Sequence, residues 1–166
     1  MADFENRIDA LTGFGTGTGA DQADITEWLV AGARAVIDVL SPTKLQRISS
    51  TTTFQNSQDV EGKKVISVMR KDENNSNKLM PCRQVSPALK GRVTDSSYME
   101  AASTSDPVYY IENDVLNVSP THSESDSSSL VNIDLSFSGL TYDDTSITNF
   151  PDEAENAVVL FAARNA

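Results

Sequence analysis

The sequence has few of the side chains from which metal and redox sites are usually built. It contains a single cysteine, Cys82, and a single histidine, His122. One cysteine excludes an internal disulfide framework. One cysteine and one histidine together cannot supply the several nitrogen and sulfur ligands that a zinc site needs. We therefore expect no metal site and no cofactor.

Positive charge is also scarce. Thirteen basic residues stand against twenty-four acidic ones, which gives a net charge of −11. Proteins that bind nucleic acid do so mainly through Lys and Arg contacts to phosphates, so the excess of acidic residues argues against nucleic-acid binding as the main function. It is compatible with a surface past which DNA slides without binding.

Long apolar runs are absent as well. No run approaches the length of a membrane-spanning helix, and the first nine residues, MADFENRID, are polar and acidic. These features predict neither a membrane segment nor a signal peptide. We expect a protein that is made in a reducing compartment and has no membrane partner.

What the sequence does contain is helical periodicity at both ends. Apolar residues recur with helical spacing in residues 3–11, 24–40 and 151–166. The second segment is the clearest, and Asp24 with Glu27 resembles a capping box at its start. Its apolar stripe comprises Ile25, Trp28, Leu29, Gly32, Ala33, Val36, Ile37 and Leu40.

The last segment, PDEAENAVVLFAARNA, begins like a helix and then stops within its apolar part. Pro151 suits a first helical position, and the acidic residues that follow complement the positive end of the helix dipole. Val158, Leu160 and Phe161 form an apolar run with no glycine or polar tail after it. We interpret this segment as an assembly helix that buries its sides against a neighbour.

The middle of the chain, residues 45–138, is rich in β-branched side chains separated by small polar breaks. The expected strands are residues 47–54, 64–71, 78–85, 108–111, 115–118 and 130–138, with a short helix at 86–93. In the last strand Val131 and Ile133 face one way and Asn132 and Asp134 the other. Residues 120–129 (PTHSESDSSS) are expected to form a loop without apolar anchors.

This order predicts an α+β fold, in which N-terminal helices and a C-terminal helix form a helical part with a small, mostly antiparallel sheet between them. Residues 1–23 are expected to be a flexible N-terminal arm with a Gly-rich hinge, and residues 24–166 a single domain. The glycines from Gly13 to Gly19 are spaced G-x-G-x-G-x-G, which matches neither G-x-G-x-x-G nor a P-loop. A linker is the expected role of this run.

Other residues that could suggest chemistry have simpler interpretations. Asp72–Asn77 mimics the start of an EF-hand loop, but Asn77 stands where glycine is needed and Arg83 where a bidentate glutamate is needed. A β-turn is therefore expected. His122 lies among serines and acids with nothing to hold it rigidly, so a solvated loop is expected there rather than a catalytic triad. Cys82 is expected to be a small buried residue.

The acidic clusters do not indicate catalysis either. Asp143 and Asp144 fall in a loop, and Asp152, Glu153 and Glu155 fall at a helix start, where capping accounts for them. Paired catalytic carboxylates need different environments across a cleft. We nominate no catalytic residue and expect that the protein is not an enzyme.

Several segments together resemble a family of tailed-bacteriophage virion proteins of the marine-phage type. They are ITEWLVAGARAVIDVL, VISVMR, CRQVSPALKGRVTD, SDPVYYIENDVLNVSP and ITNFPDEAENAVVLFAARNA. The layout is similar to that of head-to-tail adaptor or gatekeeper-like connector (neck) proteins, and the resemblance covers residues 24–166. No catalytic motif anchors it, and members of the family continue past the final helix, whereas this sequence ends within it.

The resemblance implies a subunit of a homo-oligomeric ring, typically of twelve copies, that docks beneath the portal protein. The implied partners are further copies of the chain, the portal, a tail or nozzle protein, and DNA that passes through the channel without specific binding. The implied location is the virion, assembled in the host cytoplasm. The assembly interface is expected on the two long helices, at Trp28, Leu29, Ile37, Val158, Leu160 and Phe161.

Three alternatives remain open from the sequence. The protein could be another structural component of the virion, from the tail or the capsid surface. It could be a hydrolase that uses one of the acidic clusters. It could also be a binding module in which the hairpin 108–118 presents Tyr109 and Tyr110 to a ligand.

Overall fold

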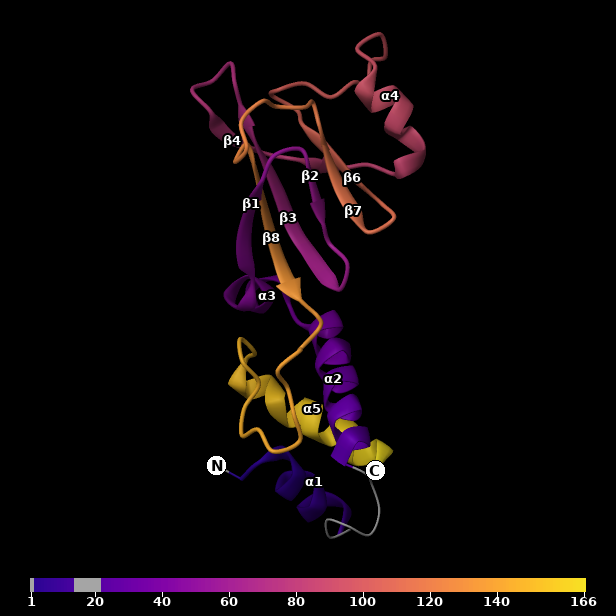
Figure 1. The fold of residues 1–166 in the computed structure, drawn as a ribbon, viewed down its shortest axis with the longest axis vertical. Helices are drawn as coiled ribbons and strands as arrows, with labels where there is room; N and C mark the ends of the chain where they lie inside the picture. Colours follow the sequence, from indigo (N-terminus) through magenta and orange to yellow (C-terminus); the bar gives the residue numbers. More distant parts are fainter. Residues whose placement is uncertain (1, 14–21) are drawn as a thin grey trace. The chain divides into compact units, whose positions relative to one another are not determined.

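The structure is a computed structural model that describes residues 2–13 and 22–166. The Gly-rich hinge that the sequence predicts lies outside the described residues. The elements in chain order are α1 (Phe4–Thr12), α2 (Gln22–Val39), α3 (Pro42–Ile48), β1 (Ser50–Phe54), β2 (Ser57–Asp59), β3 (Lys63–Asp72), β4 (Lys78–Pro81), β5 (Arg83–Gln84), η1 (Pro87–Leu89), α4 (Lys90–Thr94), β6 (Val108–Glu112), β7 (Val115–Ser119), β8 (Ser128–Asp134) and α5 (Asp152–Asn165) (Figure 1). The α+β fold class is confirmed.

The chain forms two compact units rather than the single domain expected over residues 24–166. A helical unit comprises residues 1–48 and 135–166, and a β unit comprises residues 49–134. The β unit is therefore one continuous stretch of chain inserted into the helical unit.

The helical unit contains α1, α2, α3 and α5, and its core lies where α5 packs on α1 and α2 (Figure 1). Phe4 and Ile8 of α1 are buried in this core. The loop before α5 accepts hydrogen bonds from the start of α1, because the backbone N–H of Phe4 donates to the carbonyl of Asp144 at 2.9 Å. Residues 4–12 are thus a packed helix, which differs from the flexible arm expected over residues 1–23.

The bounds of the second helix differ from the prediction at both ends. The second helix begins at Gln22, so Asp24 lies within its first turn and is not the N-cap. Pro42 follows this helix and begins a further one, α3. Proline fits the first turn of a helix, and the carbonyl of Ser41 accepts hydrogen bonds from the N–H groups of Lys44 and Leu45.

The β unit contains two four-stranded sheets, where the sequence predicted one. Sheet 1 has the order β1-β8-β3-β4 and is antiparallel throughout. Sheet 2 has the order β2-β7-β6-β5, in which only β5 and β6 run parallel. The predicted strand 78–85 is broken at Cys82, so that its first half joins sheet 1 and its second half joins sheet 2.

The two sheets share one apolar core, which identifies the unit as a sandwich. Its buried members are Phe54, Val60, Val68, Tyr109, Leu116, Val118 and Leu130. The other face of sheet 2 is covered by the insertion that contains α4, through a second cluster of Val85, Val93, Val108 and Tyr110. The last strand ends at Asp134, earlier than predicted, and residues on both of its faces are buried, since Leu130 and Asn132 are buried as well as Ile133.

Candidate functional site

Three of the six predicted assembly residues belong to the core of the helical unit. Leu29, Ile37 and Val158 are each 0% exposed. They lie on α2 and α5, which pack against each other. These side chains stabilise the fold of the chain itself, which leaves them no surface to offer a neighbouring subunit.

The close approach of the two helices also engages Phe161. A Cβ atom added at Gly32 of α2 would lie 3.2 Å from Cβ of Phe161 and 3.2 Å from the carbonyl oxygen of Val158. Glycine is therefore what permits this contact, and Phe161 packs against α2. Trp28 and Phe161 are both half-buried.

Leu160 is the one predicted assembly residue that is exposed. Its side chain is 58% exposed, whereas Ala154, Val158 and Ala162 of the same helix are buried. Helical geometry places Leu160 on the side of α5 opposite to that buried stripe. The structure therefore reduces the predicted interface on α5 to a single exposed apolar side chain.

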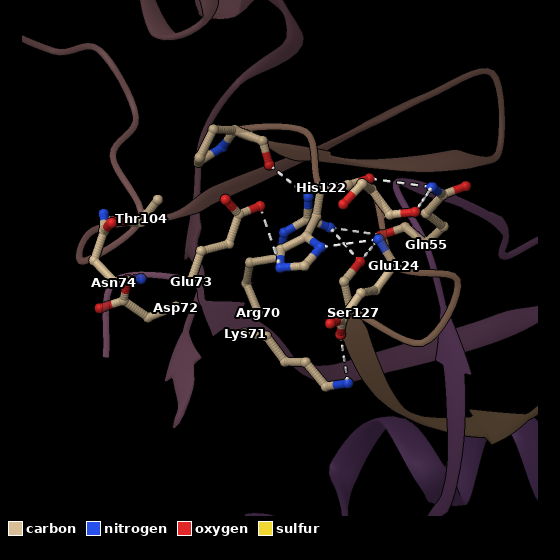
Figure 2. A network of polar contacts seen from close by, with 12 residues as sticks. Gln55, Arg70, Lys71, Asp72, Glu73, Asn74, Thr104, His122, Glu124 and Ser127 are labelled. Carbon is tan, nitrogen blue, oxygen red and sulfur yellow. Dashed lines mark hydrogen bonds and ion pairs between the residues drawn. The ribbon is translucent and has the colours of Figure 1, made fainter. Parts of the chain in front are cut away.

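The most developed polar site lies in the β unit, around Arg70 of β3. This arginine is only 1% exposed. Its Nη1 donates to the carbonyl of Gln55 and to the hydroxyls of Ser127 and Ser128, the last at 2.7 Å. Its Nη2 donates to Oδ1 of Asn56 at 2.8 Å and to the carbonyl of Pro120 at 2.7 Å. Figure 2 shows Arg70 together with Gln55 and Ser127, which supply two of these acceptors.

These contacts use the donors of both terminal nitrogens of the guanidinium group. Burial lowers the pKa of Arg70, but a guanidinium stays protonated in proteins, so the group remains a buried cation. Its partners are two carbonyl oxygens, two hydroxyls and one amide oxygen, and no carboxylate takes part in these bonds. Because its terminal donors are engaged, Arg70 holds residues 120–128 in place rather than acting as a ligand-binding group.

His122 is part of the same site, and the prediction of a solvated histidine is wrong. Its side chain is 5% exposed. Its backbone N–H donates to Oδ1 of Asn56 at 2.8 Å, and its carbonyl accepts from the side-chain amides of Gln55 and Asn56, each at 3.1 Å. The residue is held by the segment between β1 and β2 (Figure 2).

The ring of His122 is oriented so that it cannot readily bind a metal. Its Nδ1 accepts a hydrogen bond from the backbone N–H of Glu124 at 3.0 Å, so the lone pair lies on Nδ1 and the proton of the neutral ring on Nε2. Nε2 is buried 3.2 Å from Oε1 of Glu73. A metal on Nε2 would need the opposite tautomer, which would set an N–H against the N–H of Glu124.

The outer side of the same segment is held by charge. Nζ of Lys71 lies 3.1 Å from a carboxylate oxygen of Glu124 and 3.1 Å from one of Asp126. Hydrogen bonding to these two carboxylates raises the pKa of Lys71, and the lysine in turn lowers the pKa of Asp126. Residues 120–127 are thus held by the buried guanidinium of Arg70 and by the ion pairs of Lys71.

Cys82 and the two tyrosines of β6 are structural. Cys82 packs against the sandwich core, and burial raises the pKa of its thiol to about 12, so it is protonated at neutral pH and is a poor nucleophile. Tyr109 is 9% exposed in that core and Tyr110 is 6% exposed under the α4 insertion. A binding module that presents these two rings to a ligand is therefore contradicted.

The acidic clusters also have local partners. Asp143 and Asp144 accept hydrogen bonds from Thr141 within one turn. Glu155 is buried and accepts from the backbone N–H of Ile147 at 2.7 Å, which fixes the loop before α5. The turn predicted at Asp72–Asn77 is present, with Asp72 accepting from Asn74.

Within residues 2–13 and 22–166, no three His, Cys, Asp or Glu side chains are grouped so that they could hold a metal ion. None of the helices in the described part of the chain has both the length and the apolar character needed to cross a membrane.

The comparisons with known proteins add no relative. No protein-family model and no curated protein sequence matches this chain.

Proposed function

We propose that this chain is a structural protein of a tailed-bacteriophage virion, a subunit of a head-to-tail adaptor ring that docks beneath the portal. It acts by assembly and not by catalysis. Its partners are further copies of itself, the portal, a tail or nozzle protein, and DNA that passes through the channel. The resemblance of residues 24–166 to connector proteins supports this proposal.

The observation that carries the proposal is the arrangement of α5. One side of this helix is filled by the chain's own core, through Val158, Val159 and Ala162. The other side presents Leu160 at 58% exposure. One exposed leucine is a modest apolar anchor, and a closed ring repeats its contact once for every subunit.

The charge distribution supports an assembly that does not hold DNA. The residues of the helical unit include five basic and twelve acidic side chains, and those of the β unit include eight and twelve. Both units are therefore acidic, and neither has the excess of Lys and Arg that binds phosphates strongly.

Native mass spectrometry of the chain, alone and mixed with the portal protein of the same phage, tests the proposal. We expect a closed ring of about a dozen copies, alone or only with portal. Leu160→Asp places a charge in the proposed contact without touching the core, so it should abolish the ring and leave the circular dichroism spectrum unchanged. Phe161→Asp would be unsuitable because Phe161 packs against Gly32.

The matched control is Val39→Asp, which makes a similar apolar-to-acidic change at a side chain that is 83% exposed on α2. This variant should still form the ring. A chain that stays monomeric with portal present would overturn the adaptor proposal. Equal assembly of the Leu160→Asp variant would remove α5 from the interface.

A further inference from the structure

The four edge strands of the two sheets differ in how well they are protected. In sheet 2, β2 has three residues and includes Asp59, and β5 has only two residues. In sheet 1, β4 includes Lys78 and ends at Pro81. Short length, charge and proline are the usual devices that prevent an edge from pairing with another chain. β1 (Ser50–Phe54) has five residues, no charge and no proline.

The hydrogen-bond pattern shows which groups of β1 point outward. The N–H of Lys71 donates to the carbonyl of Ser127, so residues with the parity of Ser127 along β8 bond to β3. Residues with the parity of Ser128 therefore bond to β1, and their partners there are Ser50, Thr52 and Phe54. Thr51 and Thr53 consequently direct their N–H and C=O groups away from the sheet.

This edge is accessible. Thr51, Thr52 and Thr53 are all exposed, and no hydrogen bond within the described residues reaches the outward backbone groups of Thr51 and Thr53. Figure 1 shows β1 on the outer side of sheet 1, next to β8.

The lack of charge along this edge favours a second copy of the chain as its partner. The chain carries a net charge of −11, so two copies repel each other over most of their surfaces. Residues 48–58 contain no charged side chain. Two copies that meet at this edge therefore place no like charges opposite each other, and Thr–Thr pairs across antiparallel strands are favourable.

We propose that β1 is a docking edge for β1 of a second copy, paired antiparallel about a two-fold axis at Thr52. In this register Thr51 of each copy faces Thr53 of the other. The outward N–H and C=O groups of both residues then form four intermolecular hydrogen bonds, and the two Thr52 residues face each other as a non-hydrogen-bonded pair. The two copies of sheet 1 become one continuous sheet.

This inference goes beyond the adaptor proposal and does not depend on it. The contact is isologous and lies in the β unit, whereas the ring contact lies on α5. Leu160→Asp is expected to affect only the ring, and changes in β1 only the pair. The two proposals can therefore fail separately.

Disulfide trapping in the full chain tests the register. In a Cys82→Ala background, Thr52→Cys places two thiols opposite each other with Cα atoms about 4.5 Å apart, within the range of a disulfide. The matched control, Thr51→Cys, separates the two thiols by about 8 Å between Cα atoms. We expect the Thr52→Cys variant to form a covalent dimer about tenfold faster or more than the control under mild oxidation. Equal rates, or a faster control, would overturn the proposal.

A second pair of variants distinguishes a lost contact from a misfolded chain. Thr51→Lys with Thr53→Lys places like charges across the proposed contact, and Thr51→Glu with Thr53→Glu does the same with the opposite sign. Each should be monomeric in analytical ultracentrifugation, and a mixture of the two should form a heterodimer because Lys faces Glu in this register. A mixture that stays monomeric, while both chains keep the β spectrum of the parent, would reject the pairing of β1 with itself.

Discussion

Arg70 shows how one residue organises a segment distant in sequence. Its terminal nitrogens bind acceptors in residues 55–56 and 120–128, which no local pattern connects. Because the guanidinium is buried, its replacement would leave several buried acceptors without donors. Arg70 is therefore expected to matter more to the stability of the β unit than any exposed charge.

Arg70→Ala should lower the free energy of unfolding by about 3 kcal/mol or more, since each unsatisfied buried acceptor costs about 1–3 kcal/mol. Arg83→Ala is the control, because it removes an ion pair with Asp106 that is half-exposed on both sides. The control should change the free energy by less than about 1 kcal/mol. Urea unfolding followed by far-UV circular dichroism measures both, because the one tryptophan, Trp28, lies in the helical unit. Similar values for the two variants would contradict the role assigned to Arg70.

The contact of Lys71 with Asp126 predicts a pH dependence at the other side of the same segment. The pKa of Asp126 is lowered in the folded chain, so its contribution to stability is present above the ordinary value of 3.8 and is lost as the pH falls through the lowered pKa. The pKa of Lys71 is raised, so its contribution is present below 10.5 and is lost as the pH rises through the raised pKa.

An NMR titration that follows the side-chain carboxyl carbons measures the pKa of each aspartate separately. The Asp126 carboxyl should titrate below the usual range in the parent chain and move upward in the Lys71→Met variant. Asp95 is the internal reference, because its pKa is lowered by hydrogen bonds from Ser97 and not by Lys71. An Asp126 titration that does not respond to Lys71→Met would disprove the contact.

His122 and the serines before β8 explain why the polar site could not be predicted. Sequence alone shows PTHSESDSSS, a composition typical of a solvated loop. The structure buries His122, Ser127 and Ser128. Ser127 and Ser128 bind Arg70, which lies 57 residues from Ser127 in sequence, and His122 binds Gln55 and Asn56. Contacts of that range have no signal in local composition.

At the scale of elements, the contact between α2 and α5 depends on a glycine that the sequence presents only as part of an apolar stripe. An atom added at Gly32 meets Phe161 and the backbone of Val158 at 3.2 Å. Gly32→Leu should therefore force the helices apart and destabilise the helical unit by about 1–3 kcal/mol.

The control for this change is Gly91→Leu in α4, where an added Cβ meets nothing within 4 Å. Leucine has a higher helix propensity than glycine, so this variant should be neutral or slightly stabilising. Thermal unfolding followed by circular dichroism compares the two. A Gly32→Leu variant as stable as the parent would show that the helices do not depend on this close approach.

Helices and strands with strong local sequence patterns could be predicted. Elements whose bounds depend on contacts with residues distant in sequence could not. Residues 24–40 and the hairpin 108–118 have clear periodicity or turn chemistry, and both are present with small changes at their ends. The break between β4 and β5 at Cys82 could not be seen, because it depends on Cys82 donating its N–H to Val68 of sheet 1 before the chain enters sheet 2.

At the scale of the whole molecule, the fold class was predictable and the division into units was not. Helices at both ends and strands between them give α+β directly. The sequence pattern of a strand shows only that one of its faces is apolar. The same set of strand patterns is therefore compatible with one sheet or with two. The separation into two sheets is decided by which strands pair, as in the joining of β1 to β8 across 82 residues between Ser50 and Asn132.

The β unit is expected to fold without the rest of the chain. It is one continuous stretch, residues 49–134, with its own apolar core. Its two ends are neighbours, because Ser50 pairs with Asn132 in sheet 1, so excision leaves no strand without its partner.

A chain of residues 49–134 should therefore show a β-type circular dichroism spectrum and a single cooperative urea transition. The matched control is residues 49–127, which lacks β8, the strand that both β1 and β3 pair with in sheet 1. This control should be unfolded, since sheet 1 loses the strand that joins its two halves and the core loses Leu130. An unfolded chain of residues 49–134 would mean that the sandwich needs the helical unit for its stability, and the two units would then be a single cooperative domain.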